Sequence, residues 1–148
     1  MKNILVLIDK SIYDTIKPLI DKFKKYLLEN NYYIEGLFYD DKDLNIYKHF
    51  LNKDVVVIFA NNTTSFSNLF KFNKNELINH PKFILIQIGE SSISLDYKMN
   101  RLLFKNICFK YSLNNTEDIV FGNIKNKDSI TQEYLDKIVE VGKLFNED

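Results

Sequence analysis

The sequence has little of several residue types that particular classes of protein need. Its 148 residues include one cysteine, Cys108, which cannot form an intramolecular disulfide. Arg101 is the only arginine, which argues against a nucleic-acid-binding surface, because bidentate recognition of phosphate is an arginine property. With 20 basic and 20 acidic residues, the chain has no net charge to attract nucleic acid or an anionic membrane.

Glycine and long apolar runs are also scarce. The chain has four glycines, and none lies in residues 9–15 after the first apolar run. A Rossmann-type dinucleotide loop and a P-loop both need glycine there for close backbone approach to phosphate, so both are excluded. The first apolar run, residues 4–8, is too short for a secretion signal or a membrane span. We therefore expect a cytoplasmic protein.

Short apolar runs rich in β-branched and aromatic residues predict five strands. The runs cover residues 3–8, 32–39, 54–60, 82–88 and, more weakly, 106–111. The third run is apolar from Val55 to Ala60 without interruption, which is typical of a strand covered on both faces of a parallel sheet.

Amphipathic segments between the runs predict helices. One carries apolar residues at spacings of three and four from Ile16 to Leu27, with Asp14 or Thr15 as its cap and Pro18 in its first turn. The last begins at a capping box of Ser129 and Gln132. Shorter helices are expected at 44–51, 73–79 and 95–104, and 114–128 is expected to form a short helix and a loop.

Alternation of strands and helices predicts the fold class. Right-handed crossovers place helices on both faces of a parallel sheet, which gives an α/β fold of three layers. We expect a flavodoxin-like, five-stranded parallel sheet of order 2-1-3-4-5. No linker or repeat divides the chain, so residues 1–148 are predicted to form one domain.

Polar side chains follow the predicted strands and predict a ligand site. In an open parallel sheet the loops after the strands meet at the carboxyl edge, where ligands bind. The predicted ligand-binding residues are Asp9, Ser11, Asn61, Asn62, Ser65 and Ser91. A nucleotide is the ligand considered. No metal site is predicted, because the acids at 40, 41 and 43 are interpreted as a solvated turn.

Two families that share this topology can be compared with the chain. A flavodoxin has this length, but its phosphate loop is a Ser/Thr-rich turn with a glycine, and residues 11–15 depart from that pattern; no cofactor is therefore predicted. The outline also resembles receiver domains of two-component signalling, with Asp9 after the first strand and Lys110 at the fifth. An amide, Asn61 or Asn62, takes the place of the phospho-acceptor aspartate, which implies a pseudo-receiver.

A second resemblance, to TIR domains, covers mainly residues 44–89. The succession is an apolar strand at 54–60, a loop with Ser65 and Ser67, a helix with Glu76, and a further apolar strand. This resemblance implies that Glu76 takes the place of the glutamate used by TIR enzymes that cleave NAD⁺. The alternative interpretation is that Glu76 lies on the solvent-exposed surface of that helix.

The remaining candidates are few. Cys108 and His80 could form a nucleophile and base, but the predicted strand position of Cys108 favours a buried thiol. Phe66, Phe70 and Phe72 fit no single element and suggest a partner surface.

From the lack of a catalytic pair, we predict a non-catalytic signalling or interaction module with a protein partner or self-association. The alternative is a nucleotide-processing enzyme, such as a TIR-like NAD⁺ glycohydrolase.

Overall fold

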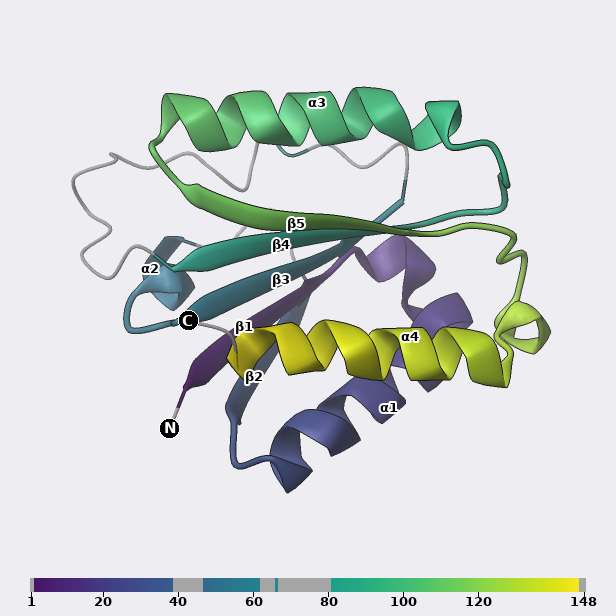
Figure 1. Ribbon diagram of the computed structural model, residues 1–148, viewed down its shortest axis with the longest axis horizontal. Coiled ribbons are helices and arrows are strands. Elements are labelled where there is room, and N and C mark those ends of the chain that lie inside the picture. The colour runs from purple at the N-terminus through teal and green to yellow at the C-terminus, as the bar shows by residue number, and fades with distance from the viewer. Residues whose placement is uncertain (1, 39–46, 62–65, 67–80, 147–148) are drawn as a thin grey trace.

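The computed structural model describes residues 2–38, 47–61, 66 and 81–146. Five parallel strands form one sheet in the order β2-β1-β3-β4-β5, so the predicted fold class and strand order are confirmed (Figure 1). The strands are β1 (Asn3–Ile8), β2 (Tyr33–Phe38), β3 (Val55–Ala60), β4 (Lys82–Ile88) and β5 (Asn114–Phe121).

Helices cover both faces of the sheet. On one face lie α1 (Tyr13–Glu29) and α4 (Gln132–Lys143), and on the other lie α2 (Tyr47–Phe50) and α3 (Leu95–Lys110) (Figure 1). Short 3₁₀ helices lie at η1 (Lys10–Ile12), η3 (Lys127–Ser129) and η4 (Leu144–Asn146). None of the helices in the described ranges is long and apolar enough to cross a membrane.

Two hydrophobic cores result from the alternation of side chains along the central strands. In β1, Ile4 and Val6 face α1 and α4, whereas Leu5 and Leu7 face α2 and α3. Every residue of β3 is buried, because both of its faces are covered and a strand on each side completes its hydrogen bonding. This explains why the apolar run of β3 is continuous.

The fifth strand was predicted in the wrong place. Residues 106–110 belong to the last turns of α3 and Tyr111 is its C-cap, whereas β5 lies at 114–121, where a short helix and a loop were expected. The buried residues of α3 follow a helical spacing through Tyr97, Asn100, Phe104 and Cys108. At the sheet edge, β5 buries Phe121 but is otherwise half-exposed or polar, so its apolar signal was weak.

Two predicted helix starts were also wrong. α1 begins at Tyr13, with Asp14 in its first turn, so Pro18 lies inside the helix. Ser129 forms a capping box with Asn126 around η3 and does not cap α4. The extended backbone of Ile130 separates the two helices, and α4 begins after Thr131. The helix predicted at 44–51 is seen as α2, whereas the one at 73–79 lies outside the described residues.

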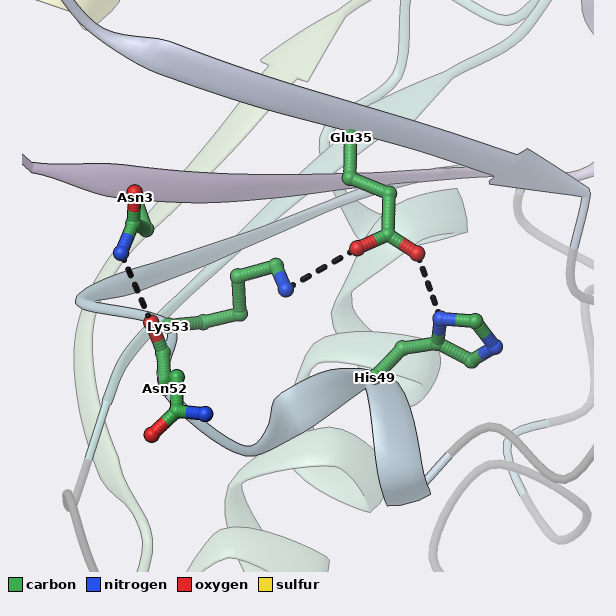
Figure 2. Close-up of polar contacts among 5 residues, drawn as sticks. All are labelled: Asn3, Glu35, His49, Asn52 and Lys53. Atoms are coloured by element: carbon green, nitrogen blue, oxygen red, sulfur yellow. Dashed lines mark hydrogen bonds and ion pairs between the residues drawn. The ribbon is translucent and has the colours of Figure 1, made fainter.

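An ion network connects the edge strand β2 to α2. The Glu35 carboxylate lies 2.9 Å from Lys53 Nζ and 2.5 Å from His49 Nδ1 (Figure 2). Nearby, Asn3 Nδ2 donates to the backbone oxygen of Asn52 at 3.1 Å. Burial raises the pKa of Glu35, but the hydrogen bonds and charges of Lys53 and His49 outweigh burial and leave that pKa below its ordinary value.

Candidate functional site

A pocket lies at the carboxyl edge of the sheet, next to the point where strand order reverses between β1 and β3. Its volume is about 240 Å³. We call it the edge pocket, and the residues that line it are Ile12, Thr15, Ile16, Asn61, Ile88, Gly89, Glu90, Ile124 and Lys125. They come from η1, which follows β1, from the start of α1, from the ends of β3 and β4 and from the loop after β5. This is where open parallel sheets bind ligands.

The carboxylate and backbone oxygens of the loop after β1 accept hydrogen bonds from N–H groups of the same loop. Asp9 is only 8% exposed, and its Oδ1 accepts hydrogen bonds from Ser11 N at 3.0 Å and Ser11 Oγ at 2.7 Å. The backbone oxygen of Asp9 accepts from Ile12 N at 3.1 Å, and the N–H of Tyr13 donates to Lys10 O. Three successive N–H groups therefore donate within the loop, which makes it a poor site for a phosphate group.

The structure brings three of the predicted ligand-binding residues together. Asn61, directly after β3, places its Nδ2 3.4 Å from Ser11 Oγ. Its backbone oxygen accepts a hydrogen bond of 3.0 Å from Asn100 Nδ2 of α3. Asp9, Ser11 and Asn61 thus form a connected polar cluster beside the edge pocket, although Asn61 alone of the three lines it.

Ser91 lies away from this cluster and stabilises the start of α3. Its Oγ accepts from Ile93 N at 3.0 Å and is hydrogen-bonded to Asp96. Its backbone oxygen accepts from Tyr97 Oη at 2.7 Å. A Cβ added to Gly122 would lie 2.6 Å from the same oxygen, so glycine is required for this close approach. The predictions for Asn62, Ser65 and Glu76 lie outside the described residues.

Several pocket residues were missed in the sequence. Thr15 was predicted only as a helix cap, and of the loop that holds Glu90 only Ser91 was predicted to bind a ligand. Ile124 and Lys125 follow the true fifth strand, which was predicted to be a short helix and a loop, so no strand end was expected there. A correct assignment of β5 is the signal that could have identified them.

A second hollow, of about 290 Å³, lies between α3 and the β4–β5 edge. Gln87, Ser94, Tyr97, Lys98 and Arg101 are among the residues that line it. Gln87 Nε2 donates to the backbone oxygen of Tyr97 at 3.0 Å, while Gln87 Oε1 is buried without a hydrogen-bond partner among the described residues. A glutamine inside the apolar run of β4 could have indicated this hollow from the sequence.

Those of the other sequence candidates that the structure describes do not form a reactive group. Cys108 lies on α3 and not on a strand; burial, with a smaller effect of Asp118, raises its pKa to about 12. Phe66 is buried against Phe104, with ring centroids 5.4 Å apart, so it does not form part of an exposed partner surface. His80, Phe70 and Phe72, and the acids at 40, 41 and 43, lie outside the described residues. Within the described ranges, no group of three or more His, Cys, Asp or Glu side chains could hold a metal ion.

Known proteins resemble this chain in structure only. No family model and no curated protein sequence matches it. Oxidised flavodoxin 1 from Bacillus cereus superposes with a TM-score of 0.67 at 12% identity, over 98% of this chain and 97% of that one. NADPH-quinone reductase from P. pentosaceus gives 0.68 at 8% identity, over 100% and 99%. General stress protein 14 from Treponema denticola, in complex with FMN, gives 0.63 at 10% identity, over 95% and 99%.

These similarities overturn the predicted function. The sequence was interpreted as a non-catalytic signalling or interaction module because its strand ends lack familiar catalytic groups. The similar structures instead include flavodoxins, an NADPH-quinone reductase, an azoreductase and a general stress protein in complex with FMN. The interpretation failed because the absence of recognisable motifs in one sequence was taken as the absence of chemistry. At identities this low, the comparisons show that the chain has a flavodoxin-like fold.

Proposed function

We propose that this chain is a flavin-binding redox protein that holds the flavin ring in the edge pocket. The position of that pocket carries the proposal: residues after β1 and β3 line it, at the point where strand order reverses, and doubly wound sheets bind ligands there. Support also comes from the similar structures, which include an FMN complex and a quinone reductase.

The lining of the edge pocket suits a planar ring with polar edges. Ile12, Ile88 and Ile124 provide apolar contacts, while Thr15 and Asn61 provide hydrogen-bonding groups. Its volume of about 240 Å³ lies just below the range of roughly 300–1,000 Å³ for small-molecule sites, so it suits a ring system better than a whole dinucleotide. A bound flavin supplies reversible electron transfer, and the protein supplies binding and polarity around the ring.

Titration with riboflavin tests this proposal. The fluorescence of riboflavin should change on binding, and the bound flavin should be reduced by dithionite and reoxidised by air. Thr15→Phe places a ring in the edge pocket and should weaken binding by about tenfold or more. Ser94→Phe fills the second hollow and is the matched control, with binding unchanged. Failure of the wild type to bind either riboflavin or FMN, or unchanged binding in Thr15→Phe, would contradict the proposal.

Two further expectations from the sequence remain predictions. The first is a cytoplasmic location, because one cysteine without a disulfide partner suits a reducing compartment. The resemblance to TIR domains stays a prediction, because Glu76 and most of the loop before it lie outside the described residues.

A further inference from the structure

We infer that the loop after β1 selects a flavin without a phosphate group, so that riboflavin binds more tightly than FMN. This inference rests on the proposed function and concerns which flavin the site accepts. Phosphate groups bind at the start of a helix when backbone N–H groups point at the ligand and no other anion is present. The loop before α1 meets neither condition.

An internal carboxylate already occupies the donors of this loop. Asp9 Oδ1 accepts from both Ser11 N and Ser11 Oγ, and the next two N–H groups donate to Asp9 O and Lys10 O. A phosphate placed here would have to displace Asp9 from its hydrogen bonds. It would also lie near a nearly buried negative charge, which repels it in a medium of low dielectric constant.

The rest of the edge pocket does not favour a second anion. Glu90 and Lys125 both line it, so the acid offsets the single cation. The other residues that line it, including Thr15 and Asn61, are uncharged, and a neutral ligand can contact them without displacing Asp9 from its hydrogen bonds. The balance of contacts therefore favours riboflavin.

The test compares riboflavin with FMN, which differ only in the phosphate group. Wild-type protein should bind riboflavin about tenfold more tightly than FMN by flavin fluorescence. Asp9→Asn removes the charge but keeps an oxygen acceptor for Ser11 N, and it should reduce this preference. Asp9→Ser also releases the donors of Ser11 and should bring FMN to equal or tighter binding.

Asp14→Asn is the control for charge alone. Asp14 is an exposed acid in the first turn of α1 and is not the acceptor for the Ser11 donors, so its variant should keep the wild-type preference. Tighter binding of FMN by the wild type, or an unchanged preference in both correctly folded Asp9 variants, would overturn this inference while leaving the proposed function standing. Failure to bind either flavin would instead remove the proposed function.

A second inference comes from the outer face of α3 and does not depend on flavin binding. Its solvent side carries Leu95, Met99, Leu102, Leu103 and Phe109, which we call the α3 stripe; they are between 42% and 89% exposed. Spacings of three and four residues place most of them on one side of the helix, opposite the buried residues Tyr97, Asn100, Phe104 and Cys108. Exposed apolar groups so concentrated mark an interaction surface.

We propose that the α3 stripe binds a second copy of this chain, with the two helices antiparallel. Asp96 and Lys110 lie at opposite ends of α3, 110 − 96 = 14 residues apart, which is close to four helical turns, so they share one side. With the two-fold axis near Leu103, Asp96 of each copy lies opposite Lys110 of the other copy. On the other flank, the charge of Lys105 is offset by Asp118, 3.6 Å away.

Charge reversal tests this arrangement by sedimentation. The wild type should be a dimer at high micromolar concentration, whereas Asp96→Lys alone and Lys110→Asp alone should be monomers, because each places like charges together. An equimolar mixture of the two variants restores opposite charges at both contacts and should restore the dimer. A monomeric wild type, or a mixture of folded variants that stays monomeric, would overturn the proposal.

Discussion

Cys108 illustrates how burial controls the chemistry of one residue. The side chain is 3% exposed on the inner face of α3, and burial raises the pKa of its thiol to about 12. Because the thiolate is the reactive form, we expect folded protein to react with iodoacetamide at least about a hundredfold more slowly than urea-unfolded protein. Mass spectrometry of the alkylated chain measures this. Equal rates in the two states would show that the thiol is accessible.

Glu35 makes stability depend on pH. Its pKa in the folded state lies below the ordinary value of 4.5, so its contribution is complete above about pH 4.5 and disappears as pH falls through the folded value. Glu35→Gln should therefore lower the free energy of unfolding by about 1 kcal/mol at pH 7. It should lower it by less at pH 3, because that pH lies below the ordinary pKa of 4.5 and part of the contribution of Glu35 is already lost there.

Urea unfolding at the two pH values measures the contribution of Glu35. Glu117→Gln, at an exposed carboxyl of β5, is the control and should have the same small effect at both values. An effect of Glu35→Gln that stays constant from pH 7 to pH 3 would indicate that lost packing, and not lost charge, causes it.

At the scale of elements, α3 offers a matched pair of phenylalanines. Phe104 is fully buried and packs on Phe66, whereas Phe109 is 89% exposed. Phe104→Ala should lower the free energy of unfolding by roughly 3–5 kcal/mol through a cavity. Phe109→Ala should change it by less than about 0.5 kcal/mol. Urea titrations of dilute protein measure both, and a large effect of Phe109→Ala there would mean that this side chain is packed in the single chain.

The elements also show what could be predicted from the sequence. β1, β3 and β4 were located because both of their faces are buried, so their apolar runs are continuous. α1 was located because only one of its faces is buried. β5 was missed since an edge strand needs few apolar residues, and Ile107, Cys108 and Phe109 made the end of α3 look like a strand. The apolar pattern of a segment indicates how much of it is buried, and the burial of a strand depends on whether it lies in the centre or at the edge of the sheet.

The candidate site was less predictable than the fold. Asp9, Ser11 and Asn61 were identified from their place after strands, since parallel strands end at one edge. Their roles could not be predicted, because only the structure shows that Asp9 accepts the hydrogen bonds donated by Ser11. Ser91 follows a strand as well, yet its oxygens are used by the start of α3. Position after a strand thus predicts proximity to the site without predicting a free binding group.

For the whole molecule, the sheet couples the two cores. Phe23 lies in the core beneath α1 and α4, Phe104 lies in the core beneath α3, and β1, β3 and β4 contribute to both. Loss of either core exposes one face of the same three strands, so neither side can remain folded alone. We therefore expect a single cooperative unfolding transition, as is usual for a domain of this size.

Substitutions on opposite faces test this coupling. Phe23→Leu and Phe104→Leu should each lower the free energy of unfolding by about 1 kcal/mol. In each variant, circular dichroism and tyrosine fluorescence should give the same shifted urea midpoint, because one transition unfolds both cores. The chain has nine tyrosines and no tryptophan, so fluorescence reports on several elements at once. Separate midpoints for the two probes would mean that one core unfolds before the other.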